Sequence, residues 1–311
     1  MILSFSDLAL LFSSTLTYAA PLIIAAMGSL MSERSGVVNI GIEGKMTIGA
    51  FVCAAVTTIT GNPWLGLFSA AITGCMFGFL HAFACVTLKA DQTISGIAIN
   101  LLAPGMALFF CKAIFDGSAQ TLPIDLDNKM PMVFMSIFPE IPEISLALGN
   151  YLTAYLCFLV AMAVWYLLFK SRLGLRVRSV GEHPRAGATL GLNVFGLRYF
   201  AVMLSGALAA LGGAIIPLST VSFFFPAIIA GQGFIAIAAV IFGKYRPRNI
   251  VLACLLFGFC KSLALMMNNP KFGLQVSVHL LNIIPYAITL IVLFFTGRSY
   301  APAASGKKYE P

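Results

Sequence analysis

Polar residues interrupt long apolar runs at a few places in this chain, and chemistry is possible at those places. The first is Ser32–Ala50, SERSGVVNIGIEGKMTIGA, where charged residues, glycines and Asn39 separate two apolar runs. Glycine allows close backbone approach and broken helices. Inside a bilayer a broken helix is tolerated where it lines a cavity or is buried in protein. Asn39 and Glu43 are therefore candidates to meet a polar solute; the alternative is a tight turn with solvated charges.

The second place is the basic stretch Ser179–Val194, SVGEHPRAGATLGLNV. Residues Glu182–Ala188 are expected to form one short helix after Gly181, since Pro184 suits a first helical turn. A short helix held between two membrane spans is suited to receive a push from a soluble motor protein. The alternative interpretation is an ordinary basic loop.

The third place is Phe224–Arg248, where Gln232 stands between two glycines at the start of a small-residue run. An amide in apolar surroundings needs a partner, so Gln232 is either a helix-to-helix hydrogen bond or a solute contact. Other polar residues within apolar runs are Asn100, His81, Lys112, Lys261 and His279. Ionisable groups inside spans are functional candidates by default, although a lysine near a span end is able to snorkel to the surface.

Motifs for covalent chemistry are missing. All seven cysteines lie in apolar runs, without a CxxC pair or a Cys/His cluster, so no disulfide framework or metal site is predicted. The sequence has no Ser/His/Asp order, no HExxH pair and no paired intramembrane carboxylates. It also lacks a Walker A loop. The chain is therefore predicted to be no enzyme, to hold no catalytic residue and no metal, and not to hydrolyse nucleotide by that route.

The elements that must position these residues are membrane helices. Hydrophobic residues make up 59% of the 311 and charged residues 10%, against about 25% charged in soluble domains. The nine apolar runs are Leu8–Met31, Thr47–Thr60, Trp64–Leu88, Thr93–Phe115, Tyr151–Phe169, Tyr199–Leu218, Pro226–Phe242, Ile250–Met267 and Val278–Phe295. We predict an all-α polytopic membrane protein with about 8–10 transmembrane helices. Thr47–Thr60 and Pro226–Phe242 are short enough to be broken or re-entrant.

Charge asymmetry orients the spans. Segment 170–198 is basic, whereas segment 116–148 is acidic, and one span separates them. Lys and Arg favour the cytoplasmic side, so 170–198 is predicted to be a cytoplasmic loop and 116–148 a periplasmic one. Residues 1–297 form one transmembrane domain on this interpretation, and 298–311 form a cytoplasmic tail expected to be disordered. The N-terminal run is interpreted as a retained span, with the N-terminus outside. The net charge of +8 then reflects orientation, not nucleic-acid binding.

The three stretches, in this order, resemble the permease subunits of bacterial ATP-binding-cassette importers of the branched-chain amino acid, ribose and nucleoside superfamily. The segment ERSGVVNIGIEGKMTIGAF (Glu33–Phe51) is the most specific match and is similar to the branch serving purine nucleosides, partnered by basic membrane lipoproteins. Ser179–Val194 resembles the cytoplasmic coupling segment. AGQGFIAIAAVIFGKYRP (Ala230–Pro247) resembles a late span of the substrate path. The resemblance covers roughly Pro21–Phe295.

The resemblance implies a complex in the bacterial cytoplasmic membrane. Two permeases, identical or paralogous, form the path within the membrane lipid, two cytoplasmic ATPases use the ATP, and a periplasmic or lipid-anchored protein delivers solute. This chain itself needs no cofactor. The residues implied to contact the ATPase are Gly181, Glu182, His183, Pro184, Arg185 and Ala186. The substrate-path candidates are Asn39, Glu43, Asn100 and Gln232. The family's usual residue before the loop proline is asparagine, and His183 is a departure from it.

The leading hypothesis is a permease for a nucleoside or a similar small polar ring compound. Within transport, the alternatives are a riboflavin permease or a simple-sugar permease. A stand-alone secondary transporter is the alternative from another class, although such proteins tend to carry ion-coupling carboxylates deep in their spans. A membrane-embedded enzyme is disfavoured because no acid, base or metal set is recognisable.

Overall fold

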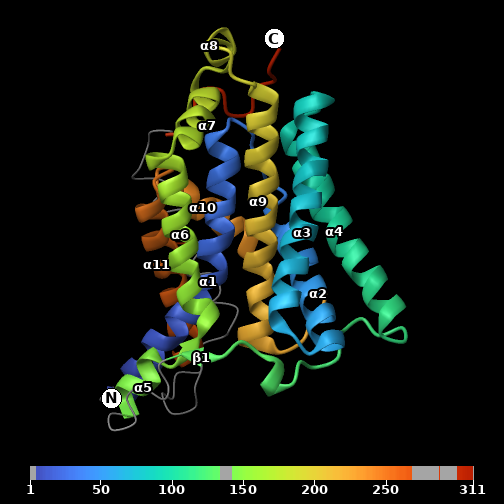
Figure 1. The fold of residues 1–311 in the computed structure, drawn as a ribbon. Helices are drawn as coiled ribbons and strands as arrows, with labels where there is room; N and C mark the ends of the chain where they lie inside the picture. Colours follow the sequence, from blue (N-terminus) through green and yellow to red (C-terminus); the bar gives the residue numbers. More distant parts are fainter. Residues whose placement is uncertain (1–4, 134–141, 268–286, 288–299, 311) are drawn as a thin grey trace.

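The computed structural model describes residues 5–133, 142–267, 287 and 300–310 as a helical bundle (Figure 1). Within those ranges seven helical segments are long and apolar enough to cross a membrane. They are α1 (Phe5–Arg34), α2 (Ile42–Thr60), α3 (Pro63–Ala82) continued by η1 (Phe83–Thr87), α4 (Gln92–Ile114), α6 (Leu152–Lys170), α9 (Val194–Ile216) continued by η3 (Pro217–Val221), and α11 (Pro247–Met267). The bundle is therefore that of an all-α multi-pass membrane protein, as predicted.

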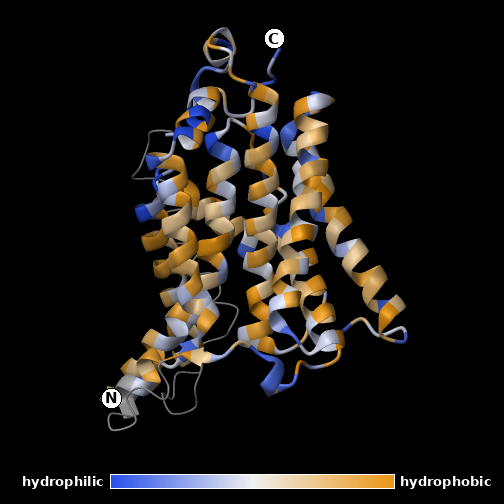
Figure 2. Ribbon diagram, in the orientation of Figure 1, coloured by the Kyte–Doolittle hydropathy of each residue, from blue (hydrophilic) through white to orange (hydrophobic). Residues whose placement is uncertain are grey.

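Shorter elements connect these spans. They are η2 (Leu126–Asn128), β1 (Met132–Val133), α5 (Pro142–Leu148), β2 (Asn150–Tyr151), α7 (Arg172–Glu182), α8 (Pro184–Thr189) and α10 (Gln232–Phe242). Strands β1 and β2 pair antiparallel, with Met132 opposite Tyr151. The apolar bodies of the long helices and the polar connections at both ends are visible in Figure 2.

The predicted apolar runs match the observed helices, with two differences in length. Helix α2 begins at Ile42 and has 19 residues, about 28 Å of helix, so it is long enough to span. The charged residues of its first turn had placed that turn outside the predicted apolar run. In the structure those charged side chains have hydrogen-bond partners within the bundle. Helix α10 has 11 residues, about 17 Å, and is too short to cross, as expected for that run. Val278–Phe295 lies outside the described residues.

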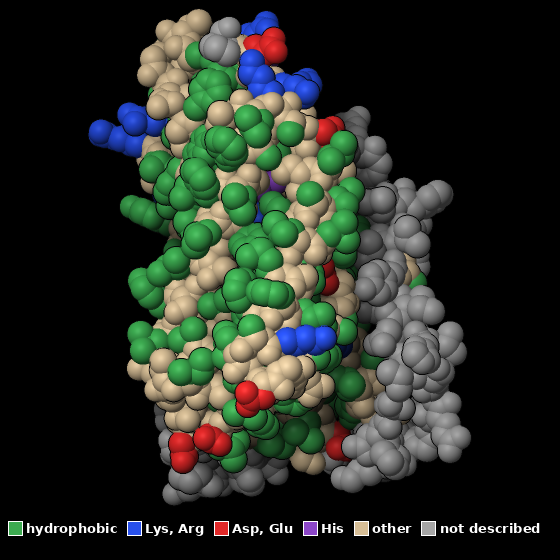
Figure 3. Space-filling model, turned by 90° about the vertical axis from the view of Figure 1, so that its right-hand side faces the viewer, with side chains coloured by type: hydrophobic (Ala, Val, Ile, Leu, Met, Phe, Trp, Pro, Cys, Tyr) green, Lys and Arg blue, Asp and Glu red, His purple; other side chains and the backbone are tan. Residues whose placement is uncertain are grey.

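The two ends of the bundle differ. Helices α7 and α8 and the C-terminal residues lie at one end, here called the α8 end; the N-terminus, β1 and α5 lie at the other, here called the β1 end (Figure 1). Figure 3 shows most of the Lys and Arg side chains of this face at the α8 end, with a few acidic ones beside them, further acidic side chains near the β1 end, and a mostly hydrophobic surface between. The basic 170–198 and acidic 116–148 segments thus lie at opposite ends, as their charges predicted.

Helix α9 is the centre of the packing. Of its most apolar 18-residue window, 78% is buried, against 28% for α4. Small residues let its neighbours approach: a Cβ on Gly49 of α2 would overlap the Ala210 backbone, and one on Gly74 of α3 would overlap the Gly206 carbonyl. Close approach through small residues is typical of helix pairs in membranes. It sets α1, α2 and α3 around α9 and brings their polar residues together.

The C-terminal tail was expected to be disordered, and for residues 300–310 this is wrong. Tyr300–Glu310, here called the strap, lies across the α8 end, where Ala304 is 4% and Tyr309 7% exposed. Its small residues allow backbone hydrogen bonding to two loops, because the amide of Ala304 donates to the Gly181 carbonyl and the amide of Gly306 to the Gly36 carbonyl. The polar composition of this segment had led to the expectation of disorder, because composition does not reveal backbone hydrogen bonds.

Candidate functional site

The connection from α1 to α2 re-enters the bundle as non-helical chain. After Arg34 the chain turns at Gly36, where φ is +84°, and residues 37–40 run inward without helix. Their backbone groups need partners because no water reaches a bundle interior. Side chains supply them: Gln92 Oε1 accepts from the Val38 amide at 2.7 Å, and Asn100 Nδ2 donates to the Ile40 carbonyl at 3.1 Å. His81 Nε2 lies 3.0 Å from the Val38 carbonyl.

A buried lysine lies beside this segment. Lys45, in the first turn of α2, is 0% exposed, and its ammonium donates to Asn39 Oδ1 at 2.7 Å. The Asn39 amide donates in turn to Ser205 Oγ of α9 at 2.9 Å. Of the residues that the structure describes, only Lys89 and Glu310 form an ion pair, so Lys45 is stabilised by a neutral amide and not by a carboxylate. The interpretation of this stretch as a turn with solvated charges is therefore wrong for Lys45.

Glu43 joins the first turn of α2 to the start of α10. Its Oε1 accepts from the Gly231 amide at 2.7 Å and its Oε2 from the Gly233 amide at 2.6 Å. The first amides of a helix lack partners within the helix and carry partial positive charge, so a carboxylate suits them. A Cβ on Gly233 would sit 2.6 Å from the Glu43 Cα, so glycine is required there. Gln232, 9% exposed, lies between the two glycines.

Asn100 completes this region from α4. Its Oδ1 accepts from the Gly44 amide at 2.8 Å, another first-turn amide of α2. The four predicted path residues therefore surround one place, the start of α2 near the middle of α9. The structure adds two that were not among the predicted path residues, Lys45 and Ser205. We call Asn39, Glu43, Lys45, Asn100, Ser205 and Gln232 the mid-bundle cluster.

The cluster provides hydrogen bonding and no evident catalysis. Its amides are neutral donors and acceptors, and its two charged groups already have partners within the chain. No group of three His, Cys, Asp or Glu residues in the described part of the chain is placed to hold a metal ion. Such an arrangement fixes the backbone geometry around the start of α2.

The second predicted site lies at the α8 end. Ser171 caps α7, its Oγ accepting from the Gly174 amide at 3.0 Å. The predicted single helix over Glu182–Ala188 is wrong at its start: α7 runs through Glu182, and α8 begins at Pro184. His183 between them has φ −138° and ψ 81°, because proline disfavours helical backbone in the residue before it. The result is a bent pair of short helices.

The six predicted coupling residues are split by exposure. Gly181 is buried against the Arg34 carbonyl, where any Cβ would clash. Glu182, His183, Arg185 and Ala186 are exposed. Leu190, just after α8, is 82% exposed. It was not predicted as a coupling residue, because the coupling residues implied by the resemblance all lie in the N-terminal half of the Ser179–Val194 segment. A single exposed apolar side chain is ordinary, and Leu190 is of interest because it directly follows the exposed residues of the predicted coupling segment.

The inner side of the α8 end is held by Arg34 and Tyr245. Arg34 donates to the Tyr245 carbonyl at 2.8 Å, and its guanidinium lies 5.8 Å from the centre of the Phe169 ring. Tyr245, in the turn between α10 and α11, is 7% exposed, and burial raises its pKa to about 12. The phenol therefore stays neutral at physiological pH. These contacts connect the ends of α1, α6 and α10.

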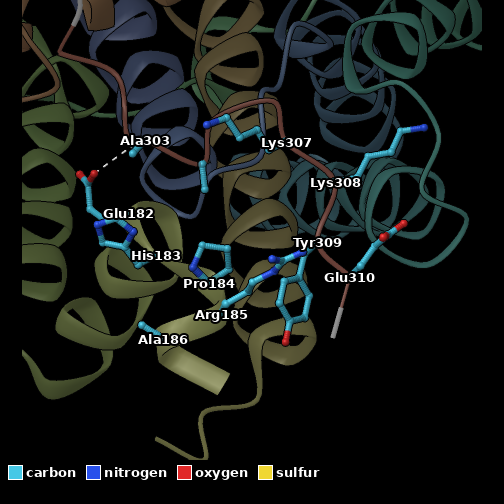
Figure 4. A pocket seen from close by; sticks show the side chains of 11 residues that line it. Glu182, His183, Pro184, Arg185, Ala186, Ala303, Lys307, Lys308, Tyr309 and Glu310 are labelled. Carbon is cyan, nitrogen blue, oxygen red and sulfur yellow. Dashed lines mark hydrogen bonds between the residues drawn. The ribbon is translucent and has the colours of Figure 1, made fainter. Parts of the chain in front are cut away.

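A hollow of about 710 Å³ lies between the coupling residues and the strap (Figure 4). Glu182, His183, Pro184, Arg185 and Ala186 line one side, and Ala303, Ala304, Lys307, Lys308, Tyr309 and Glu310 the other. The Glu182 carboxylate accepts from the Ala303 amide at 3.1 Å, which joins the two walls.

Comparison with known proteins gives consistent matches. Residues 11–293 match the family model described as the permease component of the branched-chain amino acid transport system. The chain is 43% identical to a guanosine ABC transporter permease (NupQ) of Bacillus subtilis, covering 97% of each chain. It is 39% identical to a nucleoside ABC transporter permease (NupC) of Lactococcus lactis over 98% of each. A putative glucose ABC transporter permease (TsgC13) of Haloferax volcanii is 34% identical over 92% of this chain and 91% of its own.

Proposed function

The chain belongs to the branched-chain amino acid transport permease family, and from that premise we propose that it carries nucleosides as the permease subunit of an importer. The observation that supports this most is the near full-length similarity to guanosine and nucleoside permeases. A permease subunit forms the translocation path, so transport is driven by ATP that a separate ATPase subunit hydrolyses.

The mid-bundle cluster supports an uncharged polar solute. Asn39 and Asn100 already use both ends of their amides within the chain, so the amide of Gln232 is the group of the cluster proposed to pair with the donors and acceptors of a ring compound. Glu43 and Lys45 are already engaged, so they leave no free charge to attract a charged solute. This favours a nucleoside over an amino acid, whose two charges would need counter-charges in the path.

The α8 end supports an orientation. Its concentration of Lys and Arg (Figure 3) favours the cytoplasmic side of the bacterial inner membrane. The C-terminus is then cytoplasmic, and the N-terminus lies outside. The exposed residues of the α7–α8 pair face the cytoplasmic ATPase, while the β1 end faces a periplasmic or lipid-anchored binding protein. A second permease, identical or paralogous, completes the path.

Uptake in reconstituted vesicles tests this proposal. Vesicles would contain this chain with its second permease, ATPase and binding protein, and uptake of labelled guanosine, adenosine, riboflavin and glucose would be compared. We expect nucleoside uptake that disappears when the Walker A lysine of the ATPase is replaced. Uptake of glucose alone, which the putative glucose relative makes the second candidate, or of riboflavin alone would overturn the substrate class. Nucleoside uptake without the ATPase would indicate a secondary transporter.

A further inference from the structure

The strap is attached to the coupling residues by its backbone. The Ala304 amide donates to the Gly181 carbonyl at 3.0 Å, and the Ala303 amide to Glu182 at 3.1 Å. The Gly306 amide donates to the Gly36 carbonyl at 3.3 Å. The strap thus connects the end of α7 with the turn after α1. These bonds position it without any partner protein.

The inner side of the strap covers a buried cation. Arg198, at the start of α9, is 1% exposed, and its guanidinium donates to the Lys307 carbonyl at 3.4 Å and lies 5.9 Å from the centre of the Tyr309 ring. Tyr309 also packs edge-on against Phe195, with ring centres 5.5 Å apart. Burial of Tyr309 and coverage of Arg198 give the strap a fixed inner face, so that its outer face is presented in a defined direction.

The outer side of the strap carries free positive charge. Lys307 and Lys308 are exposed and belong to the lining of the hollow together with Arg185, and Figure 4 shows their ammonium groups directed outward, away from each other. None of the three has a carboxylate within ion-pair distance in the described ranges. The two acidic residues of the lining are already engaged, Glu182 by the Ala303 amide and Glu310 by Lys89 at 3.8 Å. The lining thus carries three cations, Arg185, Lys307 and Lys308, against two carboxylates, and because Glu310 also lies near Lys89 the excess charge of the hollow is positive.

We propose that the strap and the α7–α8 pair form one composite docking site for the ATPase, and that the hollow receives an acidic segment of that subunit. This rests on the proposed function. A basic hollow of about 710 Å³ has room for a few side chains of a partner, and complementary charge steers and orients docking. The C-terminus and α8 lie at the far end of the molecule (Figure 1), beyond the apolar bodies of the helices. A soluble protein is able to reach that place, and the crosslinking described below distinguishes it from a lipid.

Charge reversal of the strap tests the site. In the assembled transporter, Lys307→Glu with Lys308→Glu is expected to weaken co-purification of the ATPase about tenfold and to lower uptake in parallel. The matched control is Lys112→Glu with Lys129→Glu, the same charge change at the β1 end, which is expected to leave ATPase co-purification unchanged. Lys307, Lys308 and Lys112 are exposed and Lys129 is half-buried over the Tyr151 ring, so the membrane abundance of each variant is measured alongside and ATPase recovery is normalised to it. Unchanged ATPase association in the strap variant would overturn the inference.

Photocrosslinking identifies what occupies the hollow. A photoreactive amino acid replacing Lys308 is expected to crosslink to an acidic segment of the ATPase, and mass spectrometry would locate it. Crosslinks confined to lipid, or to this chain itself, would overturn the inference. The outcome is separable from the proposed function: a complex that crosslinks to the ATPase but carries no nucleoside contradicts only the substrate. A complex that carries nucleoside equally well with the reversed strap contradicts only the composite site.

Discussion

The mid-bundle cluster and the α8 end are both rich in polar residues, but they use them in opposite ways. In the cluster, Lys45 is 0% exposed and donates to Asn39, and the carboxylate of Glu43 accepts from two amides of α10. At the α8 end, Lys307 and Lys308 are exposed and have no carboxylate partner among the described residues. The two sites therefore do not differ in how many polar residues they contain. They differ in whether those residues are buried and whether they have partners within the chain.

The difference has an energetic consequence. Removing one partner from a buried polar pair leaves the other desolvated and unpaired, which is costly. Changing an exposed charge alters stability little. The cluster is thus expected to hold the geometry of the path through folding stability. The α8 end is expected to act through a partner that completes it, so its variants should change binding and leave the fold intact.

The largest effect is expected from Asn39→Leu. It leaves the amine of Lys45 buried without its acceptor, which we expect to destabilise the protein by about 3 kcal/mol, the upper part of the range for an unsatisfied buried donor. Thermal unfolding of the purified transporter in detergent measures this. The matched control is Asn249→Leu at an exposed position of α11, which should shift the unfolding temperature little. Adding Lys45→Met to Asn39→Leu should restore part of the stability, and no restoration would contradict the pairing.

A smaller effect is expected from Glu43→Ala. Two amides at the start of α10 lose a charged acceptor, but Glu43 is only half-buried, so water replaces part of the loss and the net destabilisation is expected to be about 2 kcal/mol. Glu43→Gln keeps one carbonyl oxygen as acceptor and should lie between Ala and the natural residue in thermal stability and in nucleoside uptake. Equal behaviour of the Ala and Gln variants would contradict a role for the carboxylate in holding α10.

The smallest effect on stability is expected from Leu190→Asp, within about 0.5 kcal/mol because the side chain contributes little to the core. ATPase association should nevertheless fall about tenfold, since an apolar anchor at an interface is lost. Leu126→Asp is the matched control, a leucine 79% exposed at the β1 end against 82% for Leu190. Equal ATPase association in the two variants would contradict docking at the tip of α8.

Much of the fold was predictable, because membrane helices are specified by local composition. A run of apolar residues long enough to cross the bilayer satisfies its own backbone as a helix, so the spans from Leu8–Met31 to Ile250–Met267 were recognisable. The start of α2 was not, because Glu43 is satisfied by the amide of Gly231, 188 residues away, and Lys45 by Asn39 only through the fold of the non-helical segment between them.

The candidate sites were predictable in part. The coupling residues and the path residues were found from motif resemblance and from polar residues in apolar runs. The role of Ser205 was not predictable, because a serine in an apolar helix gives no sign of which neighbour it faces. The strap was missed for a related reason: its small residues bind through backbone amides, which every sequence carries.

The sequence by itself determined that the chain spans the membrane several times, that its ends differ in charge, and that it lacks a nucleotide-hydrolysing loop. These follow from composition and order along the chain, which depend on no distant contact. Only the tertiary structure decided that Asn39, Glu43, Asn100 and Gln232 surround one place, and that the C-terminal strap shares a hollow with Arg185. Those depend on which helices pack together through small residues at α9, and such packing is a property of the whole bundle.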